Sequence, residues 1–313
     1  MKLDALHFLV TGVGGWLGRV TLEVLTSTCG PDAAARIIAV GRREGMIHLA
    51  GGQKIVVYPW HFLRSIKSVA TVVVFHHAFV TKGQAGNQSE GSYRQANLEI
   101  QQVMAQFLSQ NNVAGLMVPS SGAVYTFLNK TAAATEPLFQ YGRCKYEDER
   151  VFAELADQGG FRAVIPRIFN LSGPYINNHQ GYALSSFILN CLNHEDIHVR
   201  ADHEVWRSYY SAEALVRLVL GIISAPVWDQ PLVFDTVGEE VVEVGELAQR
   251  CLHLLDNGQR EVRRPIIKPT GKDYYVGTPA VIRDIERVLG MPPVTLDAQI
   301  LETAEFLKKE RGL

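Results

Sequence analysis

The feature that most constrains the fold of this 313-residue chain is a glycine-rich turn near its start. An apolar run, Ala5 to Val10, comes before the turn, and Trp16 to Thr26 after it repeat apolar side chains at helical spacing. Gly12, Gly15 and Gly18 stand in the turn. Because glycine carries no side chain, a pyrophosphate can approach the amino end of the helix. The order of strand, glycine turn and helix therefore predicts a dinucleotide-binding unit.

Segments typical of strands and helices alternate through the first 171 residues. The strand-like runs are Arg36 to Val40, Lys54 to Val57, Val69 to Phe75, Gly115 to Val118 and Ala163 to Ile168. Helical patterns cover Ser92 to Gln110 and Tyr141 to Ala156. Such alternation is typical of an α/β protein with a Rossmann-type doubly wound parallel sheet.

The alternation loosens after residue 171, where glycine, proline and asparagine interrupt the pattern. Further helices are predicted for residues 183–192, 244–255 and 295–309. We expect an NAD(P)-binding Rossmann domain at residues 1–171 and a smaller, mainly substrate-binding domain at residues 172–313. A strand near residues 231–236 is expected to return to the sheet of the first domain.

Composition excludes several classes of partner. With 47% hydrophobic residues the chain can bury a large core, and a net charge of -2 gives no general attraction to nucleic acid or to an anionic membrane. The longest apolar stretch, Val69 to Val80, contains two histidines and is too short to cross a bilayer. The start of the chain lacks a signal-peptide pattern, and the 4 cysteines show no paired spacing. We therefore expect a cytoplasmic protein with a small-molecule ligand.

Tyr141 and Lys145 form a Tyr-x-x-x-Lys pair in a helical pattern, downstream of Ser120 and Ser121 at the end of a strand. Side chains four positions apart share one face of a helix. An ammonium beside a phenol stabilises the phenolate, so this tyrosine can exchange a proton near neutral pH. Together with the glycine turn, the pattern predicts redox chemistry at a carbonyl or alcohol carbon. The alternative is an amphipathic helix whose tyrosine packs and whose lysine is solvated.

The end of the second predicted strand bears on which dinucleotide binds. It reads Val40-Gly41-Arg42-Arg43. A carboxylate at such a strand end accepts hydrogen bonds from the ribose hydroxyls of NAD(H), whereas an arginine attracts the 2′-phosphate of NADP(H). Two guanidinium groups at this point favour NADP(H). NAD(H) is the alternative if the arginines are only solvated.

The stretch from His194 to His198 matches the zinc-binding pattern H-E-x-x-H. That pattern requires both histidines on one face of a helix. The preceding helical pattern ends near Asn193, and residues 197–200 alternate as in a strand, so the two imidazoles should diverge. No metal site is expected.

Several stretches together resemble the extended branch of the short-chain dehydrogenase/reductase superfamily, the NAD-dependent epimerase/dehydratase group that acts on nucleotide sugars. They are Thr11 to Gly18, Phe75 to Ala78, Asn97, Ser120 to Tyr125, Tyr141 to Lys145, Arg167 to Pro174 and Arg207 to Ser211. The resemblance runs nearly end to end. It implies a homodimer formed through the helices near residues 92–110 and 141–156.

The resemblance also implies roles for the matching residues. Ser121, with Ser120 as the alternative register, would hydrogen-bond to the reacting oxygen. Tyr141 would be the general acid/base, and Lys145 would bind the nicotinamide ribose. The expected cofactor-binding residues are Thr11, Gly12, Gly14, Gly15, Trp16, Leu17, Gly18, Gly41, Arg42, Arg43, His76, Ala78, Asn97, Tyr141 and Lys145. The expected substrate-binding residues are Ser121, Asn170, His179, Arg207 and Arg264, with Arg263 as an alternative to the last.

Departures from the family pattern narrow the expected activity. The 4,6-dehydratases carry an Asp-Glu pair where this chain has Gly122 and Ala123, which disfavours a dehydratase. The loop cysteine of the epimerase-reductases is also missing. We therefore expect an NADP(H)-dependent reductase of a keto group on a nucleotide-activated sugar, such as a 4-keto-6-deoxyhexose. The alternatives are an NAD-dependent C4 epimerase and a non-catalytic protein that senses NAD(P).

Overall fold

The computed structural model describes residues 3–30, 32–67, 70–81, 90–225, 227–228, 230–256, 260–269 and 271–312. The chain divides into two compact units. Unit 1 comprises Met1–Ile168 and Val216–Phe234, and unit 2 comprises Phe169–Leu215 and Asp235–Leu313. Each unit is described by itself.

Unit 1 is built on a large sheet whose described strands follow the order β13-β8-β6-β5-β1-β2-β4-β3, with β7 also paired to β8. The strands are β1 (His7–Thr11), β2 (Ile37–Gly41), β3 (Gly45–His48), β4 (Lys54–Pro59), β5 (Val72–His76), β6 (Val113–Met117), β7 (Ser120–Ser121), β8 (Arg162–Ile168) and β13 (Leu232–Asp235). Pairing from β4 through β2, β1, β5 and β6 to β8 is parallel, and only β3 runs antiparallel to its neighbour β4 among the pairs described. The predicted doubly wound parallel sheet is confirmed. The strand predicted from Val69 begins at Val72, and Val69 itself lies outside the described residues.

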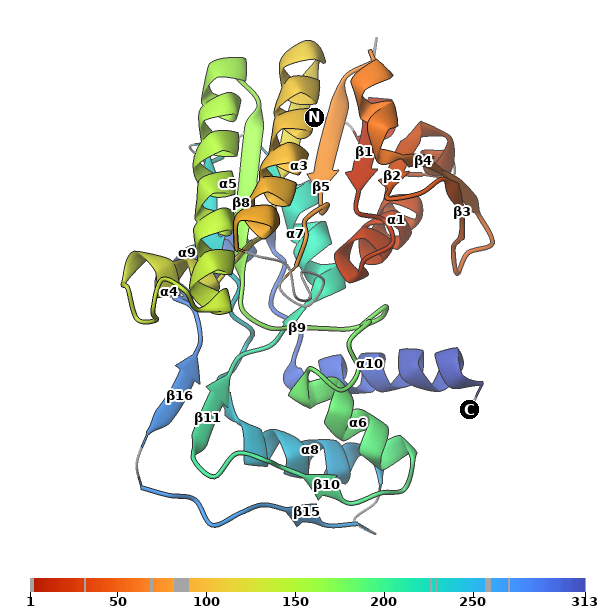
Figure 1. Cartoon of the computed structure of the whole chain (residues 1–313). Coiled ribbons are helices and arrows are strands. Elements are labelled where there is room, and N and C mark those ends of the chain that lie inside the picture. Colours follow the sequence, from red (N-terminus) through yellow and green to blue (C-terminus); the bar gives the residue numbers. More distant parts are fainter. Residues whose placement is uncertain are drawn as a thin grey trace. The chain divides into compact units, whose positions relative to one another are not determined.

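The helices of unit 1 follow from local sequence signals. They are α1 (Trp16–Thr28), α3 (Glu90–Gln110), α4 (Ala123–Leu128), α5 (Pro137–Gly159) and the larger part of α7 (Ala212–Ser224), with short 3-10 turns at Leu3–Ala5, Ala33–Arg36 and Trp60–Ser65. Helix α5 starts with a proline and ends at Gly160, which is left-handed with φ 66°. Helices α3 and α5 lie side by side (Figure 1). Apolar residues of α3, α5 and the strands, among them Phe107, Phe152 and Leu116, form the core.

Residues 216–234 were expected in the second domain, apart from the strand near 231–236, but they belong to unit 1. The reason is a close approach between α7 and the sheet. Gly115 of β6 has no side chain, and a Cβ there would lie 2.7 Å from Ile223 of α7. Arg162 of β8 also donates to the carbonyl of Ile223, and Arg217 Nη1 donates to Thr28 Oγ1 of α1 at 2.8 Å. An apolar helix is thereby buried on the large sheet rather than in the smaller unit.

Unit 2 combines packed helices with small sheets. Helices α6 (Ala183–Leu192), α8 (Val244–Leu255) and α10 (Leu296–Arg311) pack on one another, and α9 (Ala280–Leu289) was not predicted. The described small sheets pair β9 (Leu171–Ser172) with β12 (Tyr210–Ser211), β10 (Ile197–His198) with β15 (Val262–Arg263), and β11 (Glu204–Arg207) with β14 (Val242–Glu243) and β16 (Lys272–Tyr275). None of the described helices in either unit is both long and apolar enough to cross a bilayer.

Candidate active site

The candidate site of unit 1 lies where the central parallel strands end. Strand β1 ends at Thr11 and pairs with β2 on one side and β5 on the other, so the chain reverses its direction of winding at β1. Ligands of open α/β sheets bind outside the carboxyl ends of the strands at such a switch point. The register places Thr11 opposite Val40 of β2 and His76 of β5.

The glycine turn fits a dinucleotide pyrophosphate. Gly12 has φ +67°, and a Cβ there would lie 2.7 Å from the carbonyl carbon of His77, while a Cβ on Gly18 would collide with the carbonyl of Gly12. A Cβ on Gly14 would meet no atom within 4 Å, so one side of the turn is open. Helix α1 begins at Trp16 without a side-chain cap. Its first N–H groups therefore face an open turn, which is the arrangement that binds phosphate at a helix amino end.

His76, which is expected to bind the cofactor, contacts the residue that precedes the glycine turn. Its Nδ1 lies 2.9 Å from Thr11 Oγ1, and the same hydroxyl accepts the N–H of Ala78 at 3.1 Å. The imidazole is buried, and its pKa is lowered to about 3 by burial and then by the charges of Lys145 and His77. His76 is therefore a neutral structural residue that ties the end of β5 to the end of β1.

The side chain of Asn97, also expected to bind the cofactor, is hydrogen-bonded to backbone groups. Its Oδ1 accepts the N–H of Val80 at 2.8 Å, and its Nδ2 donates to the carbonyl of Val80 at 3.3 Å and to that of Tyr93 at 3.2 Å. The side chain is 5% exposed. The buried amide thus bonds the backbone N–H and carbonyl of the loop after β5, as a neighbouring strand would. Asn97 therefore supports the loop after β5, and its contact with the cofactor stays a prediction.

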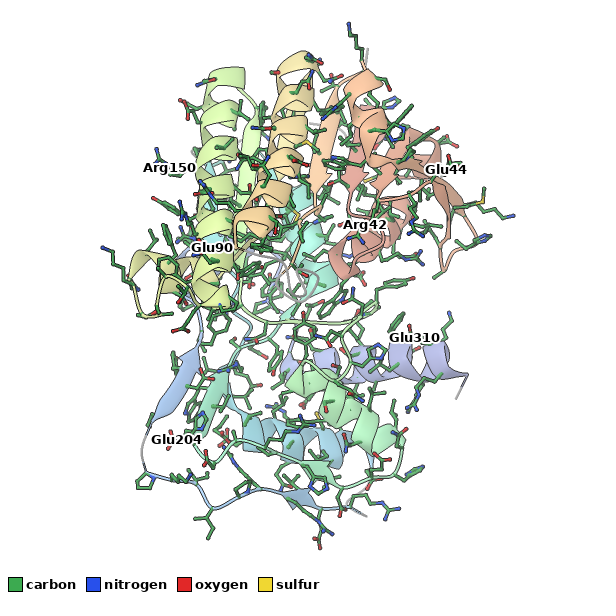
Figure 2. All side chains as sticks on the ribbon, viewed as in Figure 1. Arg42, Glu44, Glu90, Arg150, Glu204 and Glu310 are labelled. Atoms are coloured by element: carbon green, nitrogen blue, oxygen red, sulfur yellow. The ribbon has the colours of Figure 1, made fainter. Side chains whose placement is uncertain are left out.

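The two arginines that favour NADP(H) follow directly after β2. Val13 N–H donates to the carbonyl of Val40 at 3.5 Å, which keeps the glycine turn beside the end of this strand. Arg42 and Arg43 are both exposed, as is Glu44, and Figure 2 labels Arg42 and Glu44. Both arginines thus follow the strand end that adjoins the glycine turn and are exposed to solvent.

Tyr141 and Lys145 lie one turn apart on α5, as their spacing predicted. Lys145 is 7% exposed, and its Nζ donates to the carbonyl of Pro119 at 2.8 Å. Burial lowers the pKa of this amine to about 8, and the nearby carboxyl and thiol groups of Asp148, Cys144 and Glu149 oppose the shift. The amine can therefore lose its charge in a mildly alkaline solution.

Phe79, which no motif indicated, contacts both of these side chains. The Lys145 Nζ lies 3.6 Å from the centre of the Phe79 ring, and the ring meets that of Tyr141 edge to face with centroids 5.8 Å apart. Nothing in the sequence pointed to this aromatic residue after β5, because its contact with α5 forms only in the folded chain.

Ser120 and Ser121 differ in what their hydroxyls contact. Ser120 donates to the buried carboxylate of Glu149, which also accepts two hydrogen bonds from Arg167 at 2.8 and 2.7 Å. Arg167 donates in turn to the hydroxyl of Tyr125 at 3.1 Å. The Oγ of Ser121 accepts the N–H of Ala123 at 3.2 Å. The hydroxyl hydrogen of Ser120 is thus engaged by the Glu149 carboxylate.

Gly142 allows the serine strand and the tyrosine helix to approach each other. A Cβ at this position would collide with the carbonyl of Ala123 and lie 3.4 Å from Cβ of Phe127. Helices α4 and α5 therefore cross with backbone nearly in contact beside Tyr141. The sequence placed this glycine inside the motif but could not show what it packs against.

Unit 2 carries the residues expected to bind substrate. Asn170 Nδ2 donates to the carbonyl of Ser208 at 3.3 Å, so Asn170 adjoins the segment that holds Arg207. The guanidinium of Arg207 pairs with Asp273 of β16 at 2.6 Å. Asn170 therefore lies close to the segment that contains Arg207, although the two positions are 37 apart in the sequence. An anionic ligand at Arg207 has to compete with the Asp273 carboxylate.

Two other expected substrate residues have different surroundings. Arg264 is bonded to Glu243 through both nitrogens, at 2.7 and 2.9 Å, and to the carbonyls of Ala201 and His203. Arg264 thus ties β14 to the segment before β11, and an anionic ligand there has to compete with the Glu243 carboxylate. The Nε2 of His179 lies 2.8 Å from the carbonyl of Ile176 and 3.5 Å from a carboxylate oxygen of Glu310. His179 lines a cavity of about 430 Å³ with Arg200, Arg311 and residues of α6.

The H-E-x-x-H pattern does not form a metal-binding helix. Helix α6 ends at Leu192, and His194 is left-handed with φ 58°. His198 lies on β10, so the two histidines belong to different elements. Within the described ranges, no three His, Cys, Asp or Glu side chains are grouped so that they could hold a metal ion.

The Rossmann sheet and the residues at its edge define an enzyme of the short-chain dehydrogenase/reductase type. The model of the NAD dependent epimerase/dehydratase family matches residues 8–234, and the chain belongs to this family. Sequence comparison with curated proteins gave no significant match.

Solved structures share the fold at low sequence identity. The UDP-N-acetylglucosamine 4-epimerase of Methanobrevibacter ruminantium, in complex with UDP-N-acetylmuramic acid, is 17% identical over 97% of this chain and 98% of that chain, with a TM-score of 0.76. The UDP-glucose 4-epimerase of Thermus thermophilus, in complex with NAD, is 16% identical over 96% and 99%, with a TM-score of 0.70. An NAD-dependent NDP-hexosamine 5,6-dehydratase of tunicamycin biosynthesis is 17% identical over 96% and 97%, with a TM-score of 0.71.

Proposed function

We propose that this protein is an NADP(H)-dependent reductase of a keto group on a nucleotide-activated sugar, such as a 4-keto-6-deoxyhexose. The observation that carries the proposal is the set of contacts at the sheet edge. The side chains of Lys145 and Tyr141 both contact the Phe79 ring, Ser120 donates its hydroxyl hydrogen to Glu149 while Ser121 follows it on the same strand, and two arginines follow β2.

Each side chain has a chemical task in this proposal. The nicotinamide cofactor, when bound, supplies the hydride. Tyr141 donates the proton to the carbonyl oxygen, and Ser121 donates a hydrogen bond to the same oxygen as negative charge develops on it. The Lys145 ammonium favours the phenolate that Tyr141 leaves behind. Arg42 and Arg43 bind the 2′-phosphate, which distinguishes NADP(H) from NAD(H).

The nucleotide-sugar substrate is proposed from the family and from the ligands of similar structures. The similar epimerase of Methanobrevibacter ruminantium is in complex with UDP-N-acetylmuramic acid. In unit 2, Asn170 and Arg207 are the positions where we expect the diphosphate, with Asp273 displaced from the guanidinium. We also propose a cytoplasmic homodimer formed through α3 and α5, in keeping with the family resemblance.

A C4 epimerase that retains NAD is the second candidate, because several of the similar structures are 4-epimerases and some of these contain NAD. An epimerase oxidises and reduces the same carbon and consumes no net cofactor. Tightly bound NAD in the purified protein, without net NADPH consumption, would reverse the order of the two candidates.

The decisive experiment is a screen of 4-keto nucleotide sugars for oxidation of NADPH and of NADH, with product stereochemistry read by NMR. We expect turnover with NADPH and weaker binding of NADH. Tyr141→Phe should lower turnover by about 10²-fold or more because it removes the proton donor, and it should spare NADPH binding. Tyr146→Phe, on the same helix but packed on Phe127, is the matched control and should keep its activity. Unchanged turnover in Tyr141→Phe would contradict the catalytic role.

A further inference from the structure

Phe79 is a direct partner of the Lys145 amine. The distance of 3.6 Å from Nζ to the ring centre is short for an ammonium over an aromatic face. Such a cation is attracted by the negative face of the ring, and the attraction is larger where water is excluded. Lys145 is buried, so the contact lies in that favourable range.

The main chain on both sides of Phe79 is held in place. Ala78 N–H donates to Thr11 Oγ1 at 3.1 Å, which ties the preceding residue to β1. Val80 is held at both its N–H and its carbonyl by Asn97 of α3. The ring therefore cannot leave the amine through a backbone shift unless these hydrogen bonds break.

The contact with Phe79 occupies part of the hydrogen-bonding capacity of the Lys145 amine. A lysine ammonium has three N–H donors. One donates to the Pro119 carbonyl at 2.8 Å, and the Phe79 face takes a second direction. In the part of the chain that the structure describes, these are the partners found for this amine. Hydroxyl groups of a bound ribose would have to share the remaining direction or compete with the ring.

We propose that Phe79 weakens the hold of Lys145 on the nicotinamide ribose and thereby makes the cofactor readily exchangeable. The inference rests on the proposed function and deepens it. A net reductase must release the oxidised cofactor in every turnover, whereas an epimerase of this family retains it. A ring that competes for the lysine therefore suits reduction.

The test measures the affinity and the dissociation rate of NADPH with the purified full chain and no substrate. Phe79→Leu keeps an apolar side chain but removes the aromatic face, and Phe79→Trp keeps the face. We expect Phe79→Leu to lower the Kd and slow dissociation by about two- to thirty-fold, the range of a cation–π contact, and Phe79→Trp to give no tightening. Phe79→Met replaces the leucine variant if that variant does not fold. An affinity equal to or weaker than wild type in the leucine or methionine variant overturns the proposal.

A double-mutant cycle shows whether the ring acts through the amine. In a Lys145→Ala background, Phe79→Leu should leave the NADPH affinity unchanged, because the competing donor is gone. If it still tightens binding there, the ring acts by bulk alone and the proposal is wrong. The role of Phe79 and the proposed reductase function can fail separately. A wild type that binds NADPH, responds to Phe79→Leu as expected and reduces no keto sugar refutes the proposed function alone.

Discussion

At the scale of single residues, hydrogen bonds show which polar side chains hold the site together. His76, Asn97 and Ser120 are polar residues within family motifs, yet each is buried and bonded to another part of unit 1. Their positions in the motifs were predicted from sequence, but their partners were not. A motif gives residue type and order, whereas a hydrogen bond depends on residues that only the fold brings together.

The two neighbouring serines give a residue-scale prediction. Ser121→Ala should lower kcat by about 10²-fold, because it removes a donor to the reacting oxygen. Ser120→Ala should lower the free energy of unfolding by about 1–3 kcal/mol, because the buried Glu149 carboxylate loses a hydrogen bond. Steady-state kinetics and urea unfolding of both variants check this. A large loss of kcat in Ser120→Ala with normal kinetics in Ser121→Ala would show that the register is reversed.

At the scale of elements, the site depends on two close approaches that glycine permits. Gly18 lets α1 begin against the carbonyl of Gly12, and Gly142 lets α5 cross α4 beside Tyr141. The first approach was predicted from the glycine turn. The second was not, because Gly142 carries no pattern of its own and the helix it contacts, α4, was not predicted.

Gly142→Ala tests the crossing of α4 and α5. The added methyl group meets the carbonyl of Ala123, so α5 has to shift. We expect a loss of about 1–3 kcal/mol in the free energy of unfolding from overpacking, and up to about 10²-fold in kcat because Tyr141 moves with the helix. Gly91→Ala on α3 is the control, since a Cβ there meets no atom of the described residues within 4 Å and alanine favours a helix. Equal behaviour of the two variants would contradict the role of the crossing.

At the scale of the whole molecule, buried neutral histidine makes stability depend on pH. The pKa of His76 is about 3 in the folded chain and 6.5 in its ordinary state. Below pH 6.5, His76 therefore binds a proton in the unfolded chain, whereas in the folded chain it stays neutral until the pH approaches 3. Stability falls as the pH drops from 6.5 towards 3, by up to about 1.4 kcal/mol per pH unit for this group.

His76→Gln tests this linkage. Glutamine can still hydrogen-bond to Thr11 but does not titrate, so the fall in unfolding free energy between pH 6.5 and 5 should be shallower than in wild type by up to about 1.4 kcal/mol per pH unit. Urea unfolding at several pH values measures both slopes. Parallel slopes would mean that His76 takes up its proton equally in the folded and unfolded chains.

Much of this protein followed from sequence because the signals are local. The glycine turn, the alternation of strand and helix and the spacing of Tyr141 and Lys145 each lie within a short segment, where backbone sterics and helical periodicity decide the outcome. The family and the Rossmann-type sheet were predicted on that basis and are confirmed.

Only the tertiary structure decided which residues meet. It placed Phe79 on Lys145, bound Ser120 to Glu149, paired Arg264 with Glu243 and returned residues 216–234 to unit 1. Each of these outcomes involves residues that are distant in the sequence and depends on the geometry of several packed elements at once. The sequence by itself determined the chemical groups and their local spacing, and the packing of distant segments decided which of those groups remain available to a ligand.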